Sequence, residues 1–215
     1  YRQLRAGEQQ RFIQRLLQFM KEKNFIIKDD EGVKDMPVLT SAAAIQISFG
    51  LAAYTLPFYR YIRIYPEEYF ADLSFRILTG NVQGNTITIA WNHLLKGYEN
   101  ASDGSNLALH EMAHALYIQK IVIEAGYSKA FSRTYHQLIE ECKPAHQAEI
   151  KGLQNLYSDY AEQNLQEFWA ESVELFFEKP AALHENYPAI FQAMVRLLNQ
   201  DPVMRPILFR STGFR

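Results

Sequence analysis

The residues best suited to chemistry are two histidines, His110 and His114, in the run His-Glu-Met-Ala-His at residues 110–114. A spacing of four residues is about one helical turn, so both imidazoles of such a helix point the same way. Two neutral imidazoles on adjacent turns can bind one zinc ion, while Glu111 reaches the open coordination position as a general base. The pattern therefore predicts His110 and His114 as zinc ligands and Glu111 as a catalytic residue of a hydrolase.

The surroundings of this motif favour a bound metal. Apolar residues flank it on all sides of the expected helix: Leu107, Ala108, Leu109, Met112, Ala113, Ala115 and Leu116. Buried polar side chains need partners, and one zinc ion would serve both histidines. The alternative is a helix that carries these polar groups without a metal.

A third ligand is expected from a second helix, which the apolar spacing predicts over Asn164–Phe177. In thermolysin-like zinc hydrolases a carboxylate from such a helix usually completes the site, and a second acid one turn later orients a ligand histidine. We assign Glu167 as the zinc ligand and Glu171 as the acid that contacts a ligand histidine. The reverse assignment is the main alternative. For Glu174 and Glu178 we expect a solvated helix face.

Two blocks of sequence carry a family resemblance. Gly-Ser-Asn-Leu-Ala-Leu-His-Glu-Met-Ala-His at 104–114 and Glu-Phe-Trp-Ala-Glu-Ser-Val-Glu-Leu-Phe-Phe at 167–177 resemble the bacterial Mlc titration factor A family of zinc peptidases. Those peptidases belong to the gluzincin class, and their catalytic core is similar to that of anthrax lethal factor. Further landmarks resemble the family at 65–66, 90–92, 102–104 and 200–202, so the likeness extends from about Phe25 to Pro202.

The resemblance implies a role for each site residue. It makes His110, His114 and Glu167 the metal ligands and Glu111 the general base. It also places a tyrosine seven residues before the glutamate ligand, which is Tyr160 in this chain. Such a tyrosine would donate a hydrogen bond to the oxyanion as water attacks the scissile carbonyl. The alternative is that Tyr160 is merely packed.

One position departs from the family pattern. Members usually carry an aspartate three residues after the second histidine, where this chain has Tyr117. A contact that orients a metal ligand is therefore missing or is supplied by another residue, and its loss would weaken metal binding.

The activity that the resemblance implies is that of a zinc-dependent peptidase, an aminopeptidase on short peptides, with one zinc ion per chain. The alternative is a regulatory binding protein that sequesters a transcriptional repressor of sugar uptake, with peptidase activity secondary or absent. A third possibility is a zinc-bearing fold that has lost catalysis. The family also implies a cytoplasmic location.

Composition limits the partners. The 215 residues are 48% apolar with a net charge of −2 and no long basic run, so we expect neither nucleic acid nor a membrane surface as a partner. The lone Cys142 excludes an internal disulfide and suits a reducing compartment. No stretch is apolar for long enough to cross a bilayer. Because the chain begins at Tyr1, we expect upstream sequence that could hold a leader or membrane anchor.

Hydrophobic spacing and turn residues predict the remaining elements. We expect helices over Gly7–Lys23, Thr40–Leu51 and Tyr187–Leu198, a short segment Phe25–Ile27, and strands over Arg63–Tyr65, Phe75–Leu78 and Thr86–Trp91. The last strand is the clearest, and we expect it at a sheet edge beside the zinc helix. Peptidases of this broad class bind their substrate along such an edge, although the strand could equally have no ligand role.

These elements predict an α+β, mostly helical zincin-like fold with a small mixed sheet beside the zinc-binding helix. We expect one metallopeptidase domain over residues 1–215, with an N-terminal helix within 1–24 and a loosely ordered tail at 203–215. Four other histidines have no metal-binding spacing and are expected to be surface or structural residues: His93, His136, His146 and His184.

Overall fold

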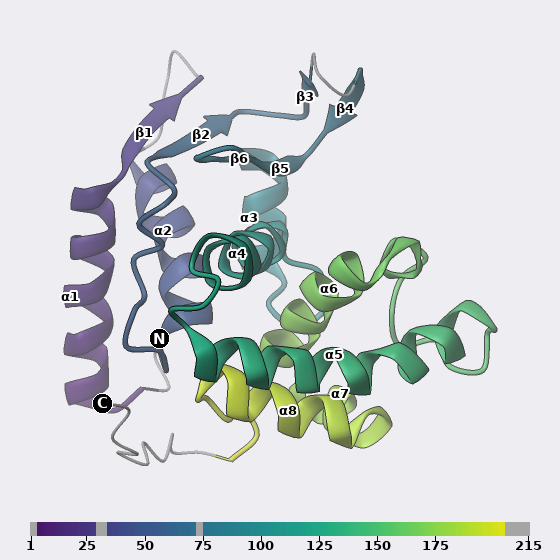
Figure 1. Ribbon diagram of the computed structural model, residues 1–215. Helices are drawn as coiled ribbons and strands as arrows, with labels where there is room; N and C mark the ends of the chain where they lie inside the picture. The colour runs from purple at the N-terminus through teal and green to yellow at the C-terminus, as the bar shows by residue number, and fades with distance from the viewer. Residues whose placement is uncertain (1–3, 29–33, 72–74, 205–215) are drawn as a thin grey trace.

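The computed structural model describes residues 4–28, 34–71 and 75–204 (Figure 1). The helices are α1 (Ala6–Glu22), α2 (Asp35–Ser48), α3 (Trp91–Glu99), α4 (Leu107–Tyr117), α5 (Lys129–Ile150), α6 (Leu165–Glu178), α7 (Pro180–Asn186) and α8 (Pro188–Leu198), with a π-helical segment η1 (Ile118–Ile123) and a 3₁₀ turn η2 (Ala161–Gln163). The strands are β1 (Asn24–Ile27), β2 (Tyr61–Tyr65), β3 (Tyr69–Ala71), β4 (Arg76–Leu78), β5 (Gly80–Gln83) and β6 (Thr86–Ala90). The expected α+β fold, mostly helical with a small mixed sheet, is confirmed.

The main sheet has the strand order β1-β2-β6-β5. Strands β1, β2 and β6 run parallel, and β5 is antiparallel to β6. The expectation that Thr86–Ala90 lies at a sheet edge is wrong, because β6 pairs with β2 on one side and with β5 on the other. Ile87, Thr88 and Ile89 are all buried, as is usual for a central strand covered on both faces. The sheet edge beside α4 is therefore β5.

The site helix α4 lies inside the molecule. Figure 1 views it nearly end-on, with the sheet above it and α5, α7 and α8 in a layer below. Its apolar residues join the main core, and α6 packs directly against it. Trp169 of α6 is fully buried and donates its indole N–H to the backbone oxygen of Ala113 at 3.1 Å, which fixes how the two helices are aligned.

Most predicted elements are present with shifted boundaries. The expected N-terminal helix is α1, the alanine-rich helix is α2 and the closing helix is α8. The long helix α5 was not predicted. Most of the expected loose tail, 205–215, lies outside the described residues, and the single-domain assignment stays a prediction. Within the described ranges, no helix is long and apolar enough to cross a membrane.

Candidate active site

Helix α4 presents both motif histidines on one face. The Asn106 side chain accepts a hydrogen bond from the backbone N–H of Leu109 at 3.1 Å, which is a standard N-cap and begins the helix just before the motif. The rings of His110 and His114 have centroids 4.8 Å apart, and their Nε2 atoms are 3.1 Å apart. The one-turn spacing thus brings two nitrogen atoms to one point.

Helix α6 brings a carboxylate to the same point. Asn164 caps this helix by accepting from the backbone N–H groups of Gln166 and Glu167. The Oε2 atom of Glu167 lies 3.0 Å from Nε2 of His110 and 3.2 Å from Nε2 of His114. The three residues form a cluster that could hold one metal ion, and no second cluster of this kind occurs among residues 4–28, 34–71 and 75–204.

The geometry of these three atoms fits a tetrahedral metal. Their separations of 3.0, 3.1 and 3.2 Å make a nearly equilateral triangle. Zinc with ligands at about 2.0–2.1 Å in a tetrahedral arrangement sets its ligand atoms roughly 3.3 Å apart. Two imidazoles and one carboxylate are also a common ligand set for catalytic zinc, which keeps its fourth position open. The residues present therefore fit the ion that the motif implies.

The charges around the histidines also suit a cation. Burial acts against a charge on His110, but hydrogen bonds to Glu167 and Glu174 and the charges of Glu174 and Glu111 raise its pKa to about 10. Burial acts to raise the pKa of Glu167, yet its bonds to His110 and His114 lower it to about 2. The carboxylates thus stabilise a positive charge at the cluster of histidines. A bound metal ion can provide this charge in place of a proton on His110.

Glu111 lies beside the cluster without a partner of its own. The side chain is 4% exposed, and its Oε2 atom is buried with no hydrogen-bond partner among the described residues. Burial, together with the charges of Glu167 and Glu174, raises its pKa to about 8, although the charge on His110 acts in the opposite direction. A β-carbon at Gly80 of β5 would lie 2.5 Å from Oε1, so the glycine leaves room for this carboxylate.

The carboxylate that orients a ligand histidine is Glu174, not Glu171. Oε1 of Glu174 lies 2.8 Å from Nδ1 of His110, on the far side of the ring from the metal-facing nitrogen. Glu171 instead accepts hydrogen bonds from the backbone N–H and hydroxyl of Ser158, at 2.6 and 2.7 Å. Helical geometry gives the reason, because a residue seven positions after Glu167 returns within about 20° of its direction, whereas one four positions later is about 40° away.

The expected solvated face at Glu174 and Glu178 is also wrong. Both are buried, with 6% and 9% of their surface exposed. Glu174 also accepts a hydrogen bond from the backbone N–H of Asn106, and Glu178 accepts from Gly104 N at 3.1 Å and from Asn106 Nδ2 at 2.9 Å. Two carboxylates of α6 therefore hold the residue that starts α4. The spacing 167, 171, 174 and 178, which is helical throughout, was the clue in the sequence.

Tyr160 lies at the edge of the cluster, where a turn leads into η2. Its ring centroid is 5.9 Å from that of His110, and the side chain is 51% exposed. The backbone N–H of Tyr160 donates to the hydroxyl of Ser158 at 3.3 Å, so Glu171 holds this turn through Ser158. Burial and the charges of Glu167 and Glu111 raise the pKa of the phenol, which therefore keeps its proton at neutral pH.

A cleft of about 630 Å³ opens onto these groups. Residues 77–80 of β4 and β5 form one wall, and residues 156–160 with α6 form the other. His110 and Glu111 lie among its lining residues, together with the loop 103–105 that precedes α4. The cleft gives an extended molecule access to Glu111 and to His110 from the same side.

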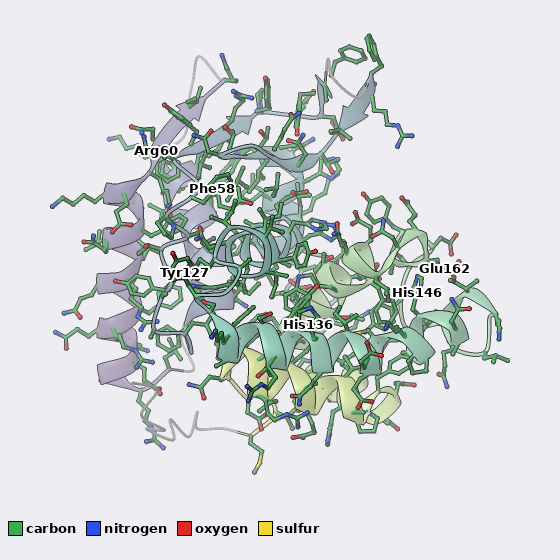
Figure 2. All side chains as sticks on the ribbon, in the orientation of Figure 1. Phe58, Arg60, Tyr127, His136, His146 and Glu162 are labelled. Atoms are coloured by element: carbon green, nitrogen blue, oxygen red, sulfur yellow. The ribbon has the colours of Figure 1, made fainter. Side chains whose placement is uncertain are left out.

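The remaining histidines lie outside the cluster, as the sequence indicates. Figure 2 shows His136 and His146 along α5, with Glu162 beside His146. His146 Nε2 lies 3.0 Å from the backbone oxygen of Glu162, and His136 Nδ1 lies 2.7 Å from that of Ser132. These contacts account for both rings without a metal.

Tyr117, which replaces the usual aspartate of the family pattern, does not contact His114 through a hydrogen bond. Its ring packs against that of Tyr135, with centroids 5.3 Å apart. Among the described residues no hydrogen bond reaches Nδ1 of His114. The two motif histidines therefore differ, because only His110 has a carboxylate at its Nδ1 atom.

A helix with His-Glu-x-x-His, a glutamate from a second helix and a mixed sheet above them define a centre of the metallopeptidase class. The comparisons agree. A family model described as "Glucose-regulated metallo-peptidase M90" matches residues 1–198, and the chain belongs to this family.

Curated relatives are distant but match over most of their length. The chain is 25% identical over 223 residues to Mlc titration factor A of Edwardsiella ictaluri, covering 92% of this chain and 82% of the relative. Mlc titration factor A of Yersinia pestis is 24% identical over 229 residues, covering 94% and 81%. An uncharacterised protein of Synechocystis is 22% identical over 229 residues, covering 95% and 81%.

Proposed function

We propose that the chain is a zinc-dependent peptidase that removes amino-terminal residues from short peptides. The observation that carries the proposal is the position of Glu111. Its buried Oε2 atom has no hydrogen-bond partner among the described residues, and its carboxylate lines the cleft with His110 and lies within range of the charges of His110 and Glu167. A buried acid with no partner is costly for stability and is typical of a group kept for catalysis. Zinc bound by His110, His114 and Glu167 would polarise a peptide carbonyl and lower the pKa of water towards neutrality.

Three side chains of the protein have separate roles in the proposed reaction. Glu111 takes the proton of the attacking water and later gives it to the leaving amine. Tyr160 donates its phenolic proton in a hydrogen bond to the oxygen of the scissile carbonyl, where negative charge develops. Glu174 holds the ring of His110 so that Nε2 stays aimed at the cluster.

The edge strand β5 supports the substrate assignment. It pairs with β6 on one side, and its other side adjoins the cleft through Gly80. A peptide can add to such an edge through backbone hydrogen bonds, which place a scissile carbonyl next to Glu111 without much selection of side chains. The charged lining of the cleft is mostly acidic, with Asp103, Glu171 and Glu174 against Lys179, which suits a cationic amino terminus.

The test compares the wild type with Glu111→Gln for metal content and for cleavage of a panel of aminoacyl chromogenic substrates. We expect one zinc ion per chain in both proteins and cleavage only by the wild type. Bound zinc without cleavage by the wild type would remove the peptidase assignment. No zinc in a metal-replete preparation would remove the site itself.

The names of the relatives support a second proposal, a binding role towards a transcriptional repressor of sugar uptake. Such binding needs a surface and does not need a general base. Glu111→Gln should therefore abolish hydrolysis and leave repressor binding unchanged. Joint loss of both would show that the two roles are not separable.

A further inference from the structure

The small hairpin of β3 and β4 has two unlike faces. One face attaches it to the rest of the protein: Tyr69 donates its hydroxyl to Oδ1 of Asn81 at 3.0 Å, and its ring stacks on that of Tyr65 with centroids 4.5 Å apart. Leu78, paired with Tyr69 across the hairpin, is half-buried. This face therefore accounts for how the hairpin is held.

The other face is apolar and open to solvent. Phe70 pairs directly with Ile77, so these two side chains lie on one side of the hairpin. Phe75 comes just before β4 and has a positive φ of 53°. The rings of Phe70 and Phe75 have centroids 6.4 Å apart in an edge-to-face contact. The exposed fractions are 57% for Phe70, 80% for Phe75 and 73% for Ile77. Three adjoining apolar side chains on a two-stranded ribbon are typical of a binding surface.

This open face continues into the catalytic cleft. Ile77 belongs to both the apolar face and the cleft wall, and the wall runs on through Leu78 and Thr79 to Gly80. Gly80 lies against the carboxylate of Glu111. Ile77 and Gly80 lie in different strands with a bend at Thr79 between them, so this stretch of chain spans at most about 10 Å, which is the length of three residues of an extended peptide. A substrate residue two or three positions from the scissile bond thus reaches Ile77.

We propose that Phe70, Phe75 and Ile77 bind a bulky apolar side chain of the peptide substrate and set its specificity. The inference rests on the proposed peptidase function and adds the preferred substrate class: peptides of at least three residues with an apolar residue two or three positions after the scissile bond. Since an aminopeptidase cuts after the first residue, the recognised side chain belongs to the third or fourth residue of the peptide.

The experiment uses pentapeptide amides of alanine with phenylalanine or glutamine at the third or fourth position. Cleavage by the metal-replete full chain is measured as kcat/KM, and binding of the same peptides is measured by calorimetry with Glu111→Gln as the background. Ile77→Thr removes apolar surface from the open face and keeps a residue that suits strands. Phe75→Asn removes apolar surface at residue 75, where the positive φ of 53° suits asparagine better than a β-branched residue. Ile13→Thr is the matched control, because Ile13 is 41% exposed on α1, and Figure 1 shows α1 on the opposite side of the molecule from the hairpin.

We expect the wild type to prefer phenylalanine over glutamine by about 10-fold or more, in the range that apolar pockets provide. Ile77→Thr and Phe75→Asn should each reduce that preference several-fold by slowing cleavage of the phenylalanine peptides alone. Ile13→Thr should leave the ratio unchanged.

Other results would overturn the inference. Cleavage without a preference for phenylalanine, or an equal loss for both peptides in Ile77→Thr, would exclude a specificity role for the hairpin. A dimer of the wild type that Ile77→Thr converts to a monomer would show that the face binds a second copy instead. If the phenylalanine peptide binds selectively but is never cleaved, the hairpin proposal stands and the proposed function fails.

Discussion

Oε1 of Glu174 lies 2.8 Å from Nδ1 of His110, and the other oxygen of the same carboxylate accepts the backbone N–H of Asn106. One side chain of α6 therefore contacts both a histidine of the candidate metal cluster and Asn106, the N-cap residue of the helix that carries it. This double contact explains why the acid seven residues after Glu167, rather than the acid four residues after it, orients the histidine.

Glu174→Gln should weaken zinc binding by about 10- to 100-fold, which is the usual effect of removing a carboxylate that orients a ligand histidine. An amide has only one oxygen, so it cannot accept from both His110 and Asn106. Competition with a chromogenic chelator measures the affinity. The exposed Glu185→Gln on α7 is the control and should bind zinc as the wild type does. Equal affinities in Glu174→Gln and the wild type would exclude the orienting role.

Gly80→Ala should abolish most peptidase activity while the protein keeps its fold and its zinc. The new methyl group would lie 2.5 Å from Oε1 of Glu111, and the flexible end of that side chain can move away more cheaply than the strand. We expect kcat to fall by about 100-fold or more, because a displaced base loses the gain from proton transfer. Gly84→Ala is a poor control because residue 84 has a positive φ of 54°, so Gly7→Ala, with open space around its α-carbon, serves instead.

Tyr160→Phe should lower kcat by about 10²- to 10³-fold, since one oxyanion donor is lost. The phenol keeps its proton at neutral pH because its pKa is raised, so the wild type can donate. KM and zinc content should not change, because the ring still packs beside His110. Steady-state kinetics together with metal analysis tests this, and a rise in KM at unchanged kcat would assign Tyr160 to substrate binding alone.

Chelation of the metal should lower the melting temperature. At a free zinc concentration 1,000 times the dissociation constant, binding adds about 4 kcal/mol to the free energy of unfolding, or roughly 10 °C for a chain of this size. Without the ion, Glu111, Glu167 and Glu174 remain close together around the histidines. Thermal unfolding with and without a chelator measures the shift. His114→Ala should melt at the same temperature in both conditions, and an equal shift there would place the stabilising ion elsewhere.

Glu178 should make stability fall as the pH rises from about 5 to 8. Burial, with the charges of Asp103 and Glu174, raises its pKa to about 7, although bonds from Asn106 and Gly104 act to lower it. The folded protein then binds a proton that the unfolded chain has released, so the contribution is full below about pH 4.5 and is lost through pH 7, an effect of about 1–3 kcal/mol. Denaturant unfolding across this range should show a weaker pH dependence in Glu178→Gln than in the wild type.

The motif histidines could be predicted because their geometry is local. His110 and His114 are four residues apart on one helix, so the helix alone brings their rings together. The carboxylates of α6 differ, because their roles depend on how two helices cross and align. The helical period places Glu174 closer than Glu171 to the direction of Glu167, but which acid contacts His110 also depends on how α6 crosses α4. The contact with His110 was assigned to Glu171 because the spacing of one turn was weighed without that crossing.

In the sheet, too, local features could be predicted and features that depend on distant residues could not. The alternation over Thr86–Ala90 predicts a strand correctly, but its neighbours in the sheet depend on pairings with distant residues. Strand β5 begins at Gly80 and lacks the β-branched pattern, so the edge beside the cleft could not be found from composition. Glycine fits at position 80 because a larger side chain there would collide with Glu111, which comes from a distant part of the sequence.

The hydrogen bond from Trp169 to Ala113 helps to fix which acid of α6 lies against the two histidines. A slide of α6 along α4 by one turn, about 5.4 Å, would bring Glu171 to the two histidines in place of Glu167. Every alternative alignment must break the indole bond and reopen a fully buried tryptophan pocket. The side chain of Trp169 thereby helps to determine which of the several glutamates of α6 faces the histidines. Weaker metal binding in a Trp169 variant would therefore indicate that α4 and α6 are misaligned, and not that a metal-binding side chain has been removed.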